Sequence, residues 1–196
     1  MRSLVALAAL VALPAVASTW DVDPAHTESS FVVKHMMVSN VRGQFGKTTG
    51  VVEQDDKDIT KSSAQLTIDA TTINTREPKR DAHLKSPDFF DAEKFPTITF
   101  KSTKIVKGEG NTLKVTGDLT IHGVTKSVVL NVEHTPETLA GGKIRRGFTA
   151  TTKVNRKDFG LNWNKAIEAG GVMVGEDVAI TVEGELVKQG PPTASN

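Results

Sequence analysis

The feature that most constrains how this chain folds is a strict alternation of apolar and polar residues, repeated in run after run. From Val178 to Leu186, every second residue is aliphatic or glycine, and the residues between them are small or polar. The stretches 64–70, 113–121 and 148–154 repeat the pattern. Successive side chains of a β-strand point to opposite faces, so the pattern predicts strands with one buried face and one wet face. Val, Ile and Thr dominate these stretches, as is typical of half-buried strands.

Short, glycine-containing connections separate several of these runs, at 108–111, 122–124 and 141–142. Connections this short join antiparallel neighbours, because parallel strands need long crossovers. About eight antiparallel strands with little helix close into a barrel or stack as a sandwich, and a barrel removes the exposed edge strands. The sequence therefore predicts an all-β fold. Strands are expected near 19–23, 29–36, 42–53, 61–70, 97–107, 112–122, 125–135, 143–157 and 177–188.

One long segment, from Arg76 to Phe95, breaks the alternation and is expected to form one or two short helical turns. Within it, Ser86 followed by Pro87 is typical of a helix start, with serine as the N-cap and proline in the first turn. A second irregular or helical patch is expected at 163–169.

The composition excludes several classes of protein. With 24 Lys and Arg against 23 Asp and Glu, the net charge of +1 lacks the surplus of cations that nucleic-acid binding requires. The chain has no cysteine, which excludes disulfides, thiolate nucleophiles and cysteine-based zinc sites. A length of 196 residues predicts one domain.

The N-terminus has the pattern of a secretory signal peptide. Arg2 precedes an apolar run from Leu4 to Leu13, which is too short to span a bilayer, and Ala15-Val16-Ala17 supplies the small-x-small cleavage site. We expect a signal peptide at 1–17 with cleavage after Ala17, a single barrel domain at 18–188 and a flexible tail at 189–196. The mature chain is expected in a bacterial periplasm with no transmembrane segment, a location that suits an exported protein without cysteine.

The interior of a barrel of about eight strands is just wide enough to be packed solid or to hold one slender ligand. The residues expected to face inward are mostly aliphatic, and several are small, among them Ala64, Ala70 and Ala150. Such a lining leaves room for an apolar chain, but the same small residues could face bulky neighbours across a filled core. The alternation alone leaves both interpretations open.

Arg80, Asp81 and His83 fall together in the irregular segment, beside Phe89 and Phe90. Arginine is a forked donor and histidine a switchable one, so this group suits a polar head at the mouth of an apolar tube. It is equally typical of solvated loop charges. A further titratable ring, that of His35, ends the apolar stripe of strand 29–36.

Motifs for catalysis or metal binding are missing from the sequence. The five histidines are scattered without ligand spacing, and there is no Gly-x-Ser-x-Gly nucleophile motif. Asp158-Phe159-Gly160 matches a kinase tripeptide but lacks its companion motifs, so we interpret the match as a coincidence. We expect neither an enzyme nor a metal site.

Seven sequence motifs occur in order along nearly the whole mature chain: 20–26, 31–45, 80–84, 88–91, 95–100, 117–123 and 158–161. Together they resemble the YceI-like family of bacterial exported, lipocalin-like proteins. The resemblance implies an extended, lipocalin-like antiparallel barrel of about eight strands with a long central pore. It also implies a bound polyisoprenoid lipid, isoprenoid quinone or other long-chain amphiphile, a periplasmic or secreted location, frequent dimerisation and links to acid or osmotic stress.

The resemblance places the ligand head group near five polar residues: His26, His35, Arg80, Asp81 and His83. The resemblance and the alternation together suggest which residues line the tail pocket. These are Phe31, Val33, Leu66, Ile68, Phe89, Phe90, Phe100, Val115, Leu119, Phe148, Ile180 and Val182.

The function expected from the sequence is non-enzymatic binding, transport or sequestration of a polyprenyl phosphate or isoprenoid quinone in the periplasm. No cofactor is expected apart from such a bound lipid or quinone, and no nucleic acid partner. A homodimer is compatible with the resemblance. Two alternatives stay open: a lipid-processing enzyme that uses His35 or His83, and a stress-response protein with a filled barrel.

Overall fold

The computed structural model describes residues 17–168 and 170–190. The predicted signal peptide therefore lies outside the described residues except for Ala17, as do residues 191–196 of the predicted tail. Most of the described chain is β-strand, as the alternation predicts. The strands are β1 (Ala17–Val22), β2 (Glu28–His35), β3 (Ser39–Phe45), β4 (Thr48–Asp55), β5 (Ser63–Asp69), β6 (Ile73–Asn74), β7 (Thr97–Lys107), β8 (Thr112–Ile121), β9 (Val124–His134), β10 (Thr138–Ala140), β11 (Lys143–Asn155) and β12 (Val174–Lys188).

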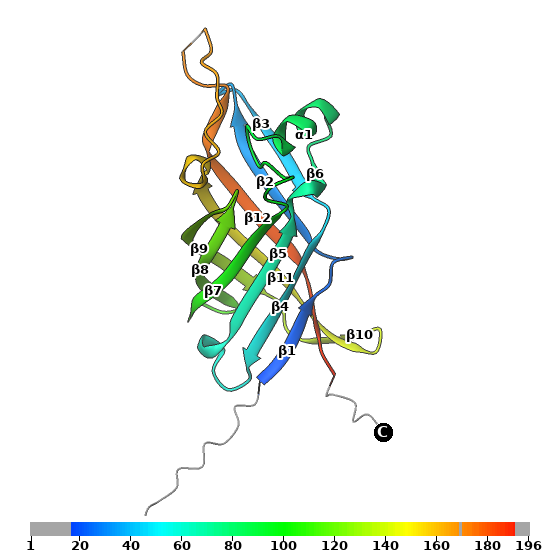
Figure 1. Cartoon of the computed structure of the whole chain (residues 1–196). Helices are drawn as coiled ribbons and strands as arrows, with labels where there is room; N and C mark the ends of the chain where they lie inside the picture. The colour runs from blue at the N-terminus through cyan, green and yellow to red at the C-terminus, as the bar shows by residue number, and fades with distance from the viewer. Residues whose placement is uncertain (1–16, 169, 191–196) are drawn as a thin grey trace, which may run out of the picture.

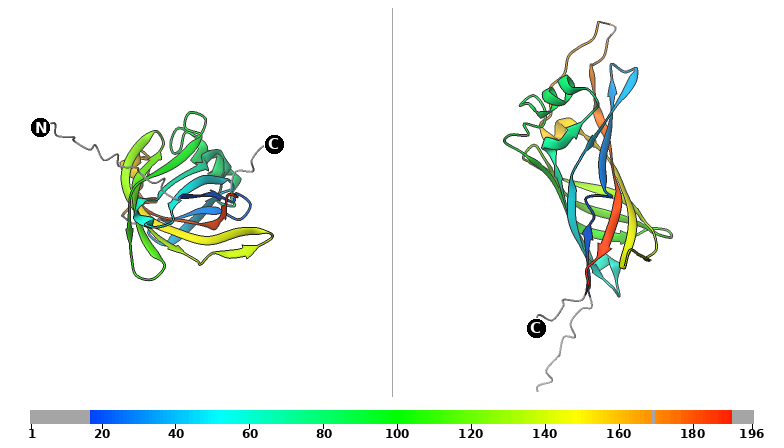
Figure 2. Two further views of the ribbon diagram at one scale, coloured as in Figure 1. Left: turned by 90° about the horizontal axis from the view of Figure 1, so that it is seen from below. Right: turned by 90° about the vertical axis from the view of Figure 1, so that its right-hand side faces the viewer.

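Eight of these strands close into an antiparallel barrel, in the order β11-β9-β8-β7-β5-β4-β1-β12 and back to β11. Strand β12 closes the ring, because one of its edges pairs with β11 and the other pairs with β1 and β2. Strands β2, β3 and β6 extend the wall at the end that carries the helix (Figures 1 and 2). We call this end, at the top of Figure 1, the upper end. The all-β barrel fold is confirmed.

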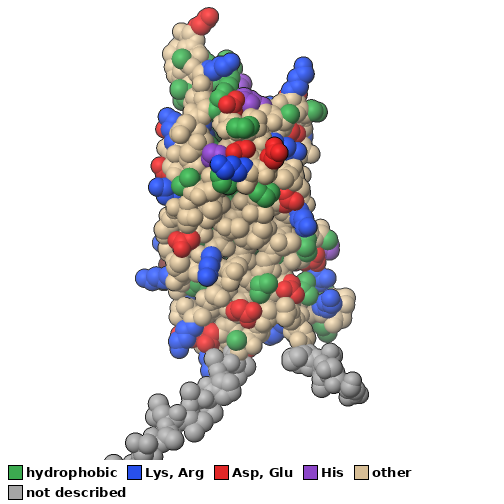
Figure 3. Space-filling view, viewed as in Figure 1, with side chains coloured by type: hydrophobic (Ala, Val, Ile, Leu, Met, Phe, Trp, Pro, Cys, Tyr) green, Lys and Arg blue, Asp and Glu red, His purple; other side chains and the backbone are tan. Residues whose placement is uncertain are grey.

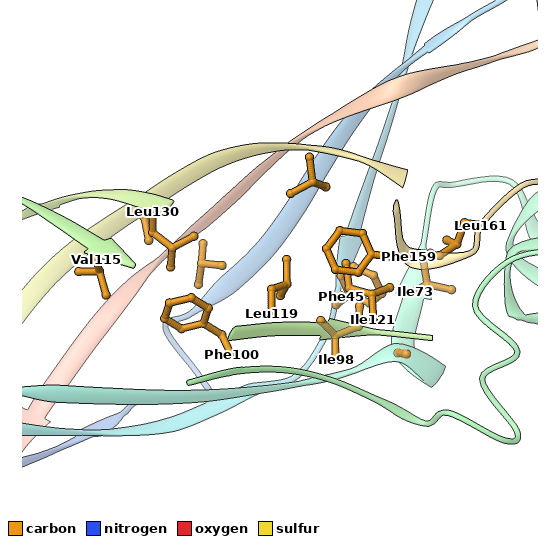
Figure 4. Packing of buried hydrophobic residues seen from close by; sticks show 14 of the residues in the cluster. Phe45, Ile73, Ile98, Phe100, Val115, Leu119, Ile121, Leu130, Phe159 and Leu161 are labelled. Carbon is orange, nitrogen blue, oxygen red and sulfur yellow. The ribbon is translucent and has the colours of Figure 1, made fainter. Parts of the chain in front are cut away.

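The alternation places the apolar residues inside the barrel. In β8, Val115, Leu119 and Ile121 are buried, whereas Lys114 and Asp118 are exposed. Most of the buried hydrophobic side chains form one cluster along the barrel axis (Figure 4), and Trp20, Val22 and Leu186 form a second, smaller cluster. On the outside, Lys and Arg side chains are interspersed with Asp and Glu, in keeping with the balanced composition (Figure 3).

The strand expected at 42–53 is two strands, β3 and β4, so that prediction is wrong. The last buried residue of β3 is Phe45 and the first of β4 is Thr48, three positions later, so the alternation changes phase between them. The break falls at Gly46, whose backbone N–H donates to Thr72 Oγ1 at 3.0 Å instead of to a neighbouring strand. A strand that keeps its period of two cannot accommodate such a shift without a break.

The helix also begins earlier than expected. Helix α1 spans Pro78–Lys85, and its N-cap is Glu77, whose carboxylate accepts from the backbone N–H groups of Lys79 and Arg80. Pro78 occupies the first turn, and Ser86 is the C-cap rather than the N-cap. The Glu-Pro pair therefore supplies the start that we assigned to Ser86 and Pro87.

The remaining helical elements are three short 3-10 turns, η1 (Ile59–Lys61), η2 (Ala70–Thr72) and η3 (Arg156–Phe159). The patch expected around 163–169 is irregular where it is described, with a single bridge between Ala166 and Val172. Among the described residues, no helix is both long and apolar enough to cross a membrane.

Candidate functional site

The barrel encloses an apolar cavity of about 140 Å³ below helix α1, which we call the upper compartment. Its side wall includes Phe31, Val33, Ile180 and Val182 from β2 and β12, and Ile68 from β5. Leu84, Phe89, Phe90 and Leu161 also line it, on the side of helix α1 and the segments at the upper end. The barrel is therefore not packed solid.

A second cavity, of about 100 Å³, continues toward the lower end, and we call it the lower compartment. Its wall includes Val115, Ile105 and Phe148. Its lining also contains polar residues, among them Gln54, His134 and Arg146. Arg146 donates to Gln54 Oε1 and Glu137 Oε1, both at 2.9 Å, and its guanidinium lies 5.0 Å from the centre of the Trp20 ring.

The twelve residues expected in the tail pocket all line one compartment or the other. Ten of them line the upper compartment, and Val115 and Phe148 line the lower one; Leu66 and Phe100 belong to both. For the ten of these residues that lie in strands, the period of two explains the placement, because it fixes which side chains face the axis. Phe89 and Phe90 lie outside the strands, and their assignment rests on the family resemblance.

Arg156 is a lining residue that the sequence analysis did not identify. It is only 5% exposed and lines the upper compartment. Its Nε donates to the Gly175 carbonyl at 2.9 Å, and its Nη atoms donate to the carbonyls of Leu161 and Val174. Within the described residues, it forms no ion pair with a carboxylate, and burial lowers the pKa of its guanidinium.

Two of these carbonyls, those of Val174 and Gly175, lie at an irregularity in β12. Pairing between β12 and β2 skips from Val174 to Val178, so the residues between them are out of register with β2. Such irregularities re-aim backbone groups and are frequent beside functional sites. Here the Gly175 carbonyl accepts from Arg156 Nε at 2.9 Å, and the Val174 carbonyl accepts from Asn164 Nδ2 at 2.7 Å as well as from the guanidinium at 3.4 Å.

A signal for Arg156 was present in the sequence. Phe148, Ala150, Thr152 and Val154 alternate along the inward face of β11, and Arg156 is the next residue in the same phase, at the start of η3. If the inward-facing pattern of β11 is continued from Val154 to Arg156, it predicts an arginine side chain inside the barrel.

His83 lies at the upper end, above the compartment, in a cluster of rings. Its imidazole meets Phe89 edge-on with ring centres 5.1 Å apart and Trp163 with ring centres 4.9 Å apart. Its Nε2 lies 2.8 Å from Asp88 Oδ2. Because Phe89 itself lines the compartment, His83 is one side chain removed from the cavity.

Arg80 and Asp81 hold the junction between β6 and α1. Arg80 Nε donates to Thr75 Oγ1 at 2.7 Å, and Asp81 Oδ1 accepts from the Thr75 backbone N–H at 2.8 Å. His35 ends β2 at the same end of the barrel, opposite Val174. Within the described residues, none of the five expected head-group residues lines either compartment.

His26 lies apart from the other four, in an exposed loop after β1. Its Nδ1 is 2.9 Å from Asp23 Oδ2, and a ligand atom of Glu185 lies within 4.8 Å of both residues, a spacing that a metal ion could use. Arg145 Nη1, however, donates to Asp23 Oδ2 at 2.9 Å and to Glu185 Oε2 at 2.7 Å. The guanidinium therefore already pairs with both carboxylates.

This network shifts the titration of Asp23. The hydrogen bond from Arg145, with a smaller contribution from His26, lowers the pKa of Asp23 from 3.8 to about 2. Because the folded pKa lies below the unfolded one, the stabilisation is complete above about pH 4 and is lost as the pH falls toward 2.

We predict that Asp23→Asn lowers the free energy of unfolding at pH 7 by about 1 kcal/mol, a value discounted because the pair is partly exposed. Urea unfolding of both proteins at pH 7 and near pH 2 measures the effect. The difference between them should shrink at the lower pH, since the Asp23 carboxylate is then being protonated. A constant difference at both pH values would contradict this role for Asp23.

Comparison with known proteins agrees with this geometry. The fold and the lumen define a lipocalin-like barrel with an apolar interior. The family model described as the YceI-like domain matches residues 20–186, so the chain belongs to the YceI-like family.

Similar proteins span several bacteria. A UPF0312 protein of Staphylococcus aureus (strain N315) is 39% identical over 167 residues, which cover 84% of this chain and 94% of that protein. The crystal structure of Burkholderia cenocepacia BcnA is 28% identical with a TM-score of 0.73, covering 85% of this chain and 98% of that one. The Campylobacter jejuni YCEI protein is 32% identical with a TM-score of 0.69, covering 80% and 90%.

A more distant structure shows the shared fold alone. It is a polyisoprenoid binding domain from Saccharophagus degradans implicated in plant cell wall breakdown, 18% identical with a TM-score of 0.61. The alignment covers 91% of this chain and 100% of that one.

Proposed function

We propose that this protein binds one long-chain isoprenoid amphiphile, a polyprenyl phosphate or an isoprenoid quinone, and carries or sequesters it without chemical change. The observation that carries the proposal is the lining of the upper compartment, in which Arg156 is the one charged side chain among the described residues. Burial of hydrocarbon against such a wall contributes about 0.8 kcal/mol per CH₂ group. A tail therefore gains affinity from the wall without polar contacts along its length.

The head group is proposed to lie at the upper end, against Arg156. A guanidinium has five N–H donors, and three of those of Arg156 donate to backbone carbonyls. A phosphate or quinone oxygen would accept from the others, and no carboxylate among the described residues competes for them by ion pairing. His83 lies at the same end, in the ring cluster above the compartment.

Two further facts support a binding role. The distant structural neighbour from Saccharophagus degradans is described as a polyisoprenoid binding domain. The apolar run and small-residue site at the N-terminus fit an export signal, so we propose that binding takes place in the periplasm.

Solvent extraction of the full chain, purified from a native lipid-containing cell, tests the proposal directly. Mass spectrometry of the extract should show an isoprenoid lipid in stoichiometric amount. Protein that yields no lipid, and that binds no added isoprenoid in solution, would contradict the proposal.

Filling part of the upper compartment should weaken binding. Val178 faces the compartment and its neighbour Ala179 faces outward on the same strand, so the same substitution at the two positions forms a matched pair. We expect Val178→Phe to weaken isoprenoid binding at least tenfold and Ala179→Phe to leave it unchanged, as measured by titration calorimetry. Equal affinities for the two variants would place the ligand outside the lumen.

Removing the buried cation should weaken binding of a charged head selectively. A hydrogen bond to a charged group contributes about 1.5–3 kcal/mol, or roughly tenfold or more in affinity. We expect Arg156→Gln to weaken binding of farnesyl phosphate at least tenfold and of farnesol less than threefold, with Arg156→Lys intermediate. Since both ligands are measured on one variant, a general loss of stability would lower both affinities together. Equal losses for the two ligands would exclude Arg156 as the anchor of the head group.

A further inference from the structure

The upper and lower compartments are separated at one level of the barrel. Leu66, Phe100 and Leu130 line both cavities; they come from β5, β7 and β9, of which β5 and β7 pair directly and β8 lies between β7 and β9. On the opposite wall, Ala150 lines only the lower compartment, whereas Val182, its partner across the β11–β12 ladder, lines only the upper one. The two cavities therefore meet at this level on both walls.

Phe100 is the largest side chain at the boundary, and the wall is shaped to receive its ring. Phe100 is 6% exposed, and its ring lies over Gly117 on the adjacent strand β8, where an added Cβ would clash with the ring. In the close view, Phe100 lies between Val115 and Leu130 on one side and Leu119, Ile98 and Ile121 on the other (Figure 4). The glycine leaves the space that the ring occupies.

The upper compartment is too small to hold an isoprenoid tail of several units. A cavity of about 150 Å³ encloses a benzene molecule, so 140 Å³ holds about six carbons, little more than one isoprene unit of five. A tail of several units that enters from the upper end therefore meets Phe100. Beyond it lies the lower compartment, where Arg146 lies over Trp20 and pairs with Glu137.

We propose that Phe100 determines the tail length that the lumen accepts, because each tail longer than the upper compartment must displace its ring to enter the lower one. This inference rests on the proposed isoprenoid binding and deepens it. Affinity then rises with tail length until the tail reaches Phe100, and rises less per added unit beyond it. Side chains elsewhere on the upper wall change the room available to every tail alike.

A series of prenyl alcohols with one, two and three isoprene units tests this, because only the one-unit alcohol fits within the upper compartment; affinities are measured by titration calorimetry on the full chain. In Phe100→Ala, the two- and three-unit alcohols should bind at least tenfold tighter, relative to the one-unit alcohol, than they do in the parent protein. Burial of two more methylene groups suffices for a factor of about ten. Phe100→Leu, which disturbs packing less, should show the same trend to a smaller extent.

Phe45→Ala is the matched control. Phe45 is also 6% exposed, and it lines only the upper compartment, so its removal should change the affinities of all three alcohols by one common factor. If parent and Phe100 variants bind with the same dependence on length, the inference is wrong and the proposed function stands. If none of the proteins binds any member of the series, both fail.

Discussion

Strand β12 is the element on which the lumen depends, because it joins the two edges of what would otherwise be an open sheet. One edge pairs with β11 from Asn155 opposite Asp177 to Arg145 opposite Val187. The other edge pairs first with β2 and then with β1, which together act as one interrupted strand. Closure satisfies the backbone groups that an edge would leave unpaired, and it encloses space that an open sheet cannot.

The same strand also shapes the upper end of the lumen. Where its pairing with β2 loses register, the carbonyls of Val174 and Gly175 accept hydrogen bonds from Arg156. A cation buried in an apolar wall is costly unless its donors are satisfied. The irregularity thus meets part of that cost and allows a charged group to remain next to hydrocarbon. Strand β12 therefore takes part both in closing the barrel and in holding Arg156 at its wall.

The local pattern is sufficient to predict the all-β class and most of the strand residues that face the axis, because strand geometry makes every second side chain point inward. It failed where the pattern itself changes. The phase shift between Phe45 and Thr48 was interpreted as one continuous strand, and the competing helix start at Glu77 was overlooked in favour of Ser86. Arg156 was missed because the inward-facing pattern of β11 was followed only to Val154, two residues before it. Each of these signals is local and was available in the sequence.

The boundary at Phe100 is different in kind, because it depends on the register of distant strands. Leu66, Phe100 and Leu130 reach one level only through the pairing of β5, β7, β8 and β9, which no short stretch of sequence specifies. Lengthening the barrel itself would require residues to be added to all of its strands together. Each strand must stay paired with both neighbouring strands and keep its apolar side chains facing inward. By contrast, a single-codon substitution at Phe100 would change how far into the lumen a tail can reach. A lineage of such proteins can therefore adapt to longer or shorter guests while the surrounding architecture remains untouched.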